Sequence, residues 1–210
     1  MSNGIQIVKR SGATEHINID KIHKVVEFAC EGLAGVSSSQ IEMNANIQFY
    51  DGMSTKEIQE VLVRSANDLI SLDAPNYQYA AARLLSYGVN KEVFGEYKPF
   101  TLMEMIKKNI DRGVYDSAIL DMYTEDEVAR LDSYIWHKRD ENFTYAGLRQ
   151  VVDKYLCQDR SSGEIFETPQ FMYMMIAATL FANYPKETRM HYVRRYYDAT
   201  SLFKINIPTP

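Results

Sequence analysis

Residues 5–22 read IQIVKRSGATEHINIDKI, and this stretch decides how the chain begins to fold. Two short apolar runs, Ile5–Val8 and Ile17–Ile19, flank a turn that contains one glycine and two adjacent cations. Apolar runs separated by such a turn predict a β-hairpin. An aspartate is typical of a helix start, so the hairpin is expected to lead directly into a helix that begins near Asp20.

The predicted turn and helix start gather positive charge. Lys9 and Arg10 lie in the turn, and Lys21 lies in the first turn of the helix. Gly12 can adopt a positive φ without steric cost, which lets the turn present backbone N–H groups. Such groups, together with the cations, attract a polyanion such as a nucleoside triphosphate. An ordinary solvated loop has the same composition, so the residues alone leave both interpretations open.

Length and composition indicate a folded globular protein. The length of 210 residues is enough for one large or two small domains. The composition, 46% hydrophobic and 24% charged, is ordinary for a folded protein. The net charge of −5 gives no electrostatic reason to expect nucleic-acid binding. The longest apolar stretch, residues 171–182, is too short to cross a bilayer, and the N-terminus has no signal-peptide pattern. Neither a nucleic acid nor a membrane is therefore expected as a partner.

The two cysteines, Cys30 and Cys157, form no metal-binding or redox motif, because the chain has no CxxC pair. Few cysteines without a disulfide framework favour a reducing, cytoplasmic location. Both thiols are expected to be small buried hydrophobic groups, and no metal site is predicted.

Helical periodicity follows the hairpin. Helices are expected from about 20 to 33, after the caps at Ser37–Ser39, after a capping box of Ser54 and Glu57, and from about 77 to 96. Pro99 then prevents continuation of the fourth helix. One hairpin and four helices predict a small α+β domain over residues 1–98.

The remainder, residues 99–210, is expected to be mainly helical, so the fold class is α+β and mostly α. Helices are expected at about 102–112, 116–123, 124–134, 144–156, 169–183 and 187–202. The Ser161–Gly163 centre between two apolar ends predicts a small hairpin. Thr168 before Pro169 predicts a helix cap with proline at the first helical position.

Several segments carry a resemblance to known proteins. Val8-Lys9-Arg10-x-Gly12, followed by Glu15, Asn18 and Asp20-Lys21-Ile22, resembles the opening of the ATP-cone domain. The segments DAPNYQYAAARL (73–84), QFMY (170–173), NYPKETR (183–189) and YYD (196–198) resemble the large α subunit of class I ribonucleoside-diphosphate reductase. The resemblance covers nearly the whole chain and is closest to the bacterial class Ia type with one intact cone.

The resemblance implies an allosteric site for ATP or dATP, with Mg²⁺ accompanying the nucleotide and no metal held by protein side chains. ATP would permit activity and dATP would suppress it. The positions that match nucleotide contacts of the family are Lys9, Arg10, Glu15, Asn18, Lys21, Ile22, Thr55, Gln59, Tyr87 and Lys91. The cations would meet phosphates, Glu15 and Asn18 would bond the sugar or base, and Ile22 and Tyr87 would enclose adenine. Gln59 departs from the histidine that close relatives often carry.

The resemblance also implies what the full-length α subunit does. It would reduce ribonucleotides to deoxyribonucleotides for DNA synthesis by radical chemistry, with the small, radical-bearing β subunit and other α subunits as partners. The closing segment FKINIPTP (203–210) resembles the lead-in to the catalytic ten-stranded α/β barrel, and Thr209 matches a residue near the substrate diphosphate. The chain is therefore expected to lack the barrel and to catalyse nothing alone. Its aromatic series, Tyr192, Tyr196, Tyr197 and Phe203, is expected to be core packing.

Two alternatives remain open at this point. One is a standalone nucleotide-sensing repressor built on the same cone, although such proteins carry a zinc ribbon that the CxxC-free sequence does not provide. The other is a helical protein-interaction module in which Lys9 and Arg10 are ordinary surface charges. Titration with nucleotide separates the second alternative from an allosteric site.

Overall fold

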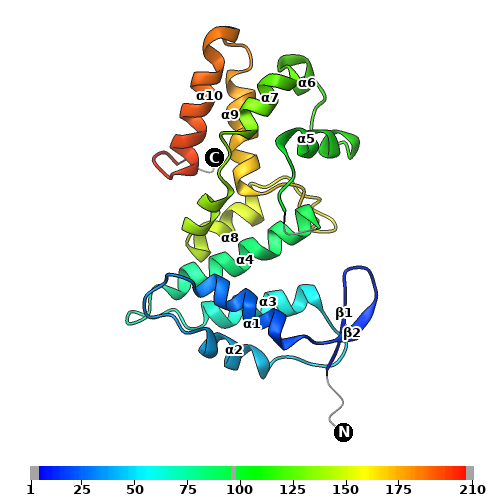
Figure 1. The fold of residues 1–210 in the computed structure, drawn as a ribbon, viewed down its shortest axis with the longest axis vertical. Helices are drawn as coiled ribbons and strands as arrows, with labels where there is room; N and C mark the ends of the chain where they lie inside the picture. The colour runs from blue at the N-terminus through cyan, green and yellow to red at the C-terminus, as the bar shows by residue number, and fades with distance from the viewer. Residues whose placement is uncertain (1–4, 96–97, 207–210) are drawn as a thin grey trace. The chain divides into compact units, whose positions relative to one another are not determined.

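The structure is a computed structural model that describes residues 5–95 and 98–206 (Figure 1). It is mainly helical with one small three-stranded sheet, which confirms the predicted fold class. The chain divides into two compact units. Unit 1 comprises Met1–Gly88 with Glu141–Gln150, and unit 2 comprises Val89–Asp140 with Val151–Pro210. The division falls within helix α4 (Tyr77–Phe94), and the predicted domain limit at residues 98 and 99 stays a prediction.

The sheet of unit 1 contains β1 (Gln6–Val8), β2 (Thr14–His16) and β3 (Met53–Ser54) in the order β2-β1-β3. β1 pairs antiparallel with β2 and parallel with β3. The predicted hairpin is present, but its second strand ends before residues 17–19, where it was expected. The reason is local, because the Asn18 side chain accepts a hydrogen bond from the Lys21 N–H and so starts a helix at Ile19.

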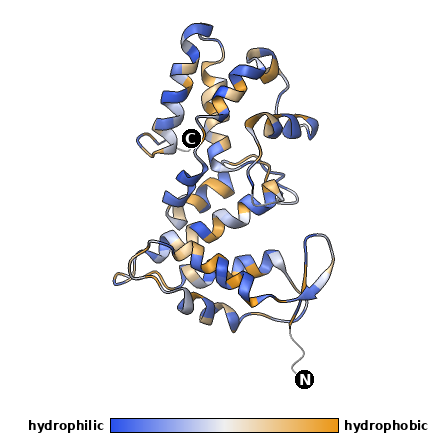
Figure 2. Cartoon of the chain, in the orientation of Figure 1, coloured by the Kyte–Doolittle hydropathy of each residue, from blue (hydrophilic) through white to orange (hydrophobic). Residues whose placement is uncertain are grey.

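Unit 1 also contains helices α1 (Ile19–Cys30), α2 (Ser38–Asn46) and α3 (Thr55–Asn67) and most of α4. The Ser54 and Glu57 capping box opens α3 as predicted, and the Ser37 side chain caps α2. Each helix buries apolar side chains in a common core, which contains Val26, Ile41, Leu62 and Leu84. Figure 2 shows that most helices carry both hydrophobic and hydrophilic residues, as expected of elements with one face in a core.

Unit 2 contains α5 (Leu102–Asp111), α6 (Ala118–Met122), α7 (Glu125–Asp132), α9 (Pro169–Phe181) and α10 (Lys186–Ser201). The 3₁₀ helix η1 (His137–Asn142) and helix α8 (Tyr145–Lys154) continue across the division into unit 1. The apolar helix α9 packs beside α10, which Figure 2 shows as mostly hydrophilic. The buried Tyr197 hydroxyl of α10 donates to Gln170 Oε1 of α9 at 2.6 Å, so these two helices are also joined by a polar contact.

Three local predictions in residues 99–206 need correction. Thr168 occupies the N-cap of α9 and Pro169 begins the helix, as predicted, but the Thr168 side chain makes no capping bond, and its buried hydroxyl has no hydrogen-bond partner among the described residues. The expected hairpin around residues 161–163 is reduced to a single antiparallel bridge between Gln158 and Ile165. The aromatic series is only partly core, since Tyr197 is buried whereas Tyr192 and Phe203 are 38% and 47% exposed.

Candidate functional site

The hairpin turn holds an ion pair between two of the predicted site residues. Lys9 Nζ lies 2.6 Å from Glu15 Oε2, and both side chains are partly exposed. Gly12, at φ 81°, lets the turn close, and the Lys9 N–H donates to the Ala13 carbonyl at 2.8 Å. The hydrogen bond from Lys9 lowers the pKa of Glu15, and the nearby charge of Lys21 acts in the same direction. The charges of Lys9 and Lys21, two further residues of the predicted site, therefore both act on Glu15.

The start of α1 supplies the next part of this group. The Asn18 side-chain oxygen Oδ1 accepts the Lys21 N–H at 3.0 Å, which fixes the side chain at the helix N-terminus. This leaves the Asn18 amide nitrogen as the group that can donate to a ligand. Ile22 is half-buried one turn into the helix, with Lys21 exposed beside it. The first turn of α1 thus presents a cation, an amide and a partly accessible apolar side chain.

Helix α4 brings an aromatic side chain to the hairpin. Tyr87 is half-buried, and this burial raises the pKa of its hydroxyl. The positive charge of Arg10 opposes the shift. Arg10 and Tyr87 are 77 positions apart in sequence, so this influence comes from the fold and not from the local sequence.

Helix α3 borders the same region. Ser54 pairs with Val8 in the parallel register, so Thr55 at the start of α3 lies level with Lys9, where the turn begins. Gln59 lies one turn further along α3 and on the same side of the helix as Thr55. Its Nε2 donates to the Leu84 carbonyl of α4 at 2.6 Å, so this amide is already engaged within the protein.

Two predicted residues are not joined to the group by these contacts. Lys91 is exposed in the last turn of α4, four positions after Tyr87 and beyond the division between the units, so its place at the site stays a prediction. Thr209 lies outside the described residues.

Neither cysteine has the properties of a reactive group. Cys30 and Cys157 are half-buried, and burial raises the pKa of their thiols to about 11 and about 12. Both are therefore protonated at neutral pH, and a thiol is a far weaker nucleophile than a thiolate. Within residues 5–95 and 98–206, no three His, Cys, Asp or Glu side chains gather as they would around a metal ion. The helices of the same residues include none long and apolar enough to span a membrane.

Sequence reasoning missed two features of this site. The short strand β3 aligns α3 with the hairpin, but two residues carry too little pattern to predict a strand. The close approach of α3 and α4 was also missed. A Cβ placed on Gly88 would lie 3.0 Å from Gln59 Cγ, so glycine permits this approach. A glycine within a predicted helix was the available signal.

Comparison with known proteins shows two family matches. Residues 5–91 match the ATP cone domain, and residues 141–210 match the ribonucleotide reductase all-alpha domain. Over all 210 residues the chain is 50% identical to ribonucleoside-diphosphate reductase 1 subunit alpha of Salmonella typhimurium and 49% identical to that of Escherichia coli. The alpha subunit of Enterobacteria phage T4 is 39% identical over 208 residues, which is 98% of this chain and 27% of that subunit. The chain spans 28% of the length of the two bacterial relatives.

Proposed function

This chain belongs to the ribonucleotide reductase α-subunit family, and from that premise we propose that its residues 5–91 bind an adenine nucleotide and regulate a ribonucleoside-diphosphate reductase. The observation that carries the proposal is the ATP-cone match over residues in which the fold gathers Lys9, Arg10 and Lys21 around one hairpin and one helix start. A net negative chain that concentrates cations at one place is suited to a local anion.

Lys9, Arg10 and Lys21 are proposed to bind the triphosphate. Lys9 is paired with Glu15, so a phosphate would have to compete for the ammonium group. The pair is partly exposed, which makes the exchange inexpensive, because water already screens the interaction. A phosphate offers several charged acceptors and forms stronger, charge-assisted hydrogen bonds. Glu15 is then released to accept a hydroxyl of the sugar.

The remaining positions are proposed to bind the sugar and the base. The Asn18 amide nitrogen can donate to either, while Ile22 and Tyr87 provide apolar and aromatic surface for adenine. Thr55 and Gln59 border this space from α3, and Lys91 would approach the phosphates from the end of α4. ATP and dATP differ only at the 2′-hydroxyl, so discrimination between them requires a polar contact near the sugar.

Mg²⁺ is proposed to arrive with the nucleotide. Because Mg²⁺ in nucleotide sites is bound largely by phosphate oxygens and water, the site needs no cluster of protein ligands. Lys9, Arg10 and Lys21 fit that arrangement, since they would contact the phosphates directly and leave the metal ion to phosphate oxygens and water.

We propose that a full-length protein containing this region reduces ribonucleoside diphosphates in the cytoplasm, with a β subunit and further α subunits as partners. ATP would favour the active assembly and dATP the inactive one. A coupling free energy of about 1–3 kcal/mol between nucleotide and assembly is sufficient for such a switch.

Isothermal titration of the 210-residue chain with ATP and dATP tests the site. Lys9→Ala and Lys21→Ala should each weaken binding about tenfold or more, because each removes a charge-assisted hydrogen bond. Lys24→Ala is the matched control, since it removes an exposed lysine of the same helix outside the proposed group. Unchanged affinity in a folded Lys9→Ala/Lys21→Ala variant would refute the assignment, and no binding at all would favour the interaction-module alternative.

A further inference from the structure

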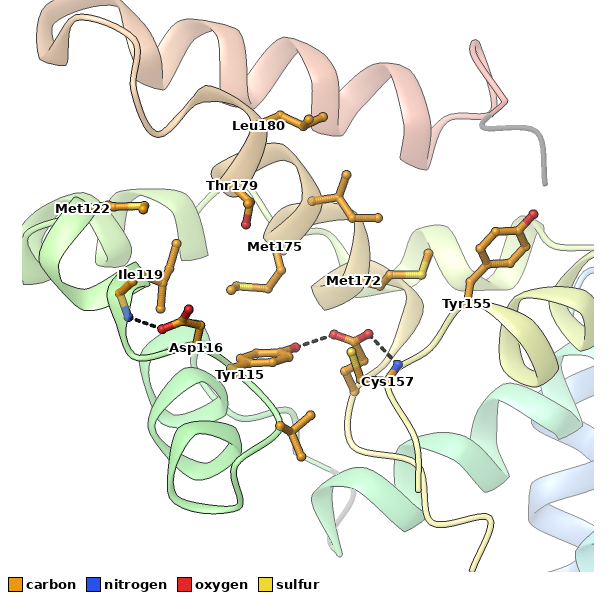
Figure 3. Close-up of a pocket in the computed structure, with 14 residues that line it drawn as sticks. Tyr115, Asp116, Ile119, Met122, Tyr155, Cys157, Met172, Met175, Thr179 and Leu180 are labelled. Atoms are coloured by element: carbon orange, nitrogen blue, oxygen red, sulfur yellow. Dashed lines mark hydrogen bonds between the residues drawn. The ribbon is translucent and has the colours of Figure 1, made fainter. Parts of the chain in front are cut away.

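A hollow lies within unit 2, and its lining includes none of the residues assigned to the nucleotide (Figure 3). Its volume of about 500 Å³ is in the range of pockets that hold small organic molecules. The walls come mainly from α6 and one side of α9, and their apolar side chains are Ile119, Met122, Met172, Met175, Ile176 and Leu180. Methionine adapts its shape easily and makes favourable sulfur contacts with aromatic rings. The walls therefore suit a flat apolar or aromatic body.

A buried carboxyl group gives this hollow a polar end. Glu167 is 2% exposed, accepts a hydrogen bond from the Tyr115 hydroxyl, and accepts the Cys157 N–H at 2.8 Å (Figure 3). Both of these donors are neutral groups, and burial raises the pKa of the Glu167 carboxyl group. A buried carboxylate without a cation is costly, and an opposite charge brought by a ligand would relieve that cost.

The charged side chains that line the hollow are acidic. Asp116 also lines it, and no Lys, Arg or His side chain is among the lining residues that the structure describes. The Thr179 hydroxyl can accept or donate a hydrogen bond. The two carboxyl groups therefore favour a ligand that supplies hydrogen-bond donors and carries no negative charge.

We propose that this hollow binds a compact organic cation, with an apolar or aromatic body against the methionines and an ammonium group directed to Glu167. The ammonium group has three donors and no acceptor, which complements the remaining lone pairs of Glu167 and the carboxylate of Asp116. This site would be separate from the nucleotide site and does not depend on it.

Tryptamine is a suitable probe, because two near-isosteres separate charge from shape. Tryptophol replaces the ammonium group by a hydroxyl, and indole-3-propionate carries a carboxylate. Tryptamine should bind about tenfold or more tightly than tryptophol, since hydrogen bonds to charged groups exceed neutral ones by that margin. Indole-3-propionate should bind most weakly. Equal affinity for tryptamine and tryptophol would overturn the proposal.

Methyl-labelled methionine locates the probe. The chain has ten methionines, of which Met122, Met172 and Met175 line the hollow. Their NMR signals should move with tryptamine, whereas Met43 and Met53 of unit 1 should not. Shifts confined to other methionines, or no shift at millimolar tryptamine, would contradict the assignment.

Two carboxyl variants test the charge. Glu167→Gln should reduce the preference for tryptamine over tryptophol to the two- to fivefold share that Asp116 supplies, and leave tryptophol binding within about twofold. If Glu167→Gln fails to fold, Asp116→Asn provides the test, because Asp116 is exposed and its amide analogue can still accept the Ala118 N–H. Asp116→Asn should weaken tryptamine about two- to fivefold, as expected for a partly solvated pair. An unchanged preference for tryptamine in the folded variant would refute the role of charge.

Discussion

The Gln59 side-chain amide donates to the Leu84 carbonyl at 2.6 Å, and this bond joins α3 to α4 beside the proposed nucleotide site. In an α-helix the same carbonyl also accepts the N–H four residues later, which here belongs to Gly88. A Cβ at Gly88 would lie 3.0 Å from Gln59 Cγ, closer than side chains normally approach. Gln59 and Gly88 are therefore matched in size, and each limits what the other position can hold.

Gly88→Ala should have opposite effects on stability in two backgrounds. Alanine stabilises a helix by about 1 kcal/mol relative to glycine. With Gln59 present the new methyl group displaces the amide, and loss of its bond to Leu84 costs about 0.5–1.5 kcal/mol in addition to strain. In a Gln59→Ala chain the obstruction is absent, so Gly88→Ala should raise the free energy of unfolding by about 1 kcal/mol. Urea denaturation of the four chains measures this cycle, and additive effects would contradict it.

Gln59→His should change the ratio of dATP to ATP affinity more than it changes the magnitude of either. Histidine cannot keep the reach of the glutamine amide to Leu84, so the ring would turn toward the proposed sugar region. A buried polar group left without a partner costs about 1–3 kcal/mol, enough for a several-fold preference. Titration of both nucleotides checks the ratio, with the exposed neighbour Glu60→His as control. Overlaid isotherms for Gln59→His and the parent would remove Gln59 from the site.

Helix starts could be predicted from this sequence because their chemistry is local. Ser54 with Glu57, Thr101 with Glu104 and Thr124 with Glu127 all form capping boxes, and each requires only residues three positions apart. Thr168 shows the limit of the same logic, because it occupies the N-cap of α9 as predicted, but its buried hydroxyl makes no capping hydrogen bond. Burial of that position is decided by tertiary packing rather than by its neighbours in sequence.

The types of residue in the candidate site could also be predicted, but not their partners. The family pattern identified Lys9, Glu15 and Lys21, and the fold places their charges near one another. The influence of Arg10 on Tyr87 depends on how the hairpin meets α4, which involves residues 77 positions apart. The acidic hollow in unit 2 has no sequence signature at all, because its lining comes from separate segments between residues 114 and 180.

Arg189 and Glu127 form an ion pair whose loss should destabilise unit 2. Arg189 is 3% exposed, lies over the Tyr123 ring at 4.3 Å, and places Nη2 2.6 Å from Glu127 Oε1. Glu127 is only partly buried, so the carboxylate left without its partner can still reach water, and Arg189→Met should lower the free energy of unfolding by about 1–3 kcal/mol. The exposed Arg194→Met on the same helix should change it by less than about 1 kcal/mol. Similar losses in both variants would contradict the importance of burial.

The Arg189–Glu127 pair also predicts that the stability of unit 2 depends on pH in the acid range. Burial raises the pKa of Glu127, but the hydrogen bonds from Arg189 and the Thr124 N–H, together with the Arg189 charge, outweigh it and lower the pKa overall. A lowered pKa means that Glu127 stabilises the fold above its ordinary value of 4.5 and that this contribution is lost as the pH falls through the lowered value. Glu127→Gln should therefore make the melting temperature less sensitive to pH below 4.5. An unchanged acid slope would show that Glu127 does not contribute to it.

His23 should titrate above its ordinary value and link α1 to α2 in a pH-dependent way. Its Nδ1 lies 2.7 Å from Glu42 Oε1 of α2, and its Nε2 lies 3.1 Å from Glu27 Oε1 of α1. The hydrogen bond to Glu42 raises the pKa of His23 most, and the charges of both carboxylates act in the same direction against burial. Because the folded pKa is raised, the stabilising contribution is present below 6.5 and is lost as the pH rises through the raised value.

NMR titration should show the pKa of His23 falling in Glu42→Gln and falling less in Glu27→Gln. The melting temperature of His23→Gln should also vary less between about pH 6 and pH 8 than that of the parent. If His23 instead titrates at the same pH in the parent and in Glu42→Gln, the contact between α1 and α2 does not form in solution.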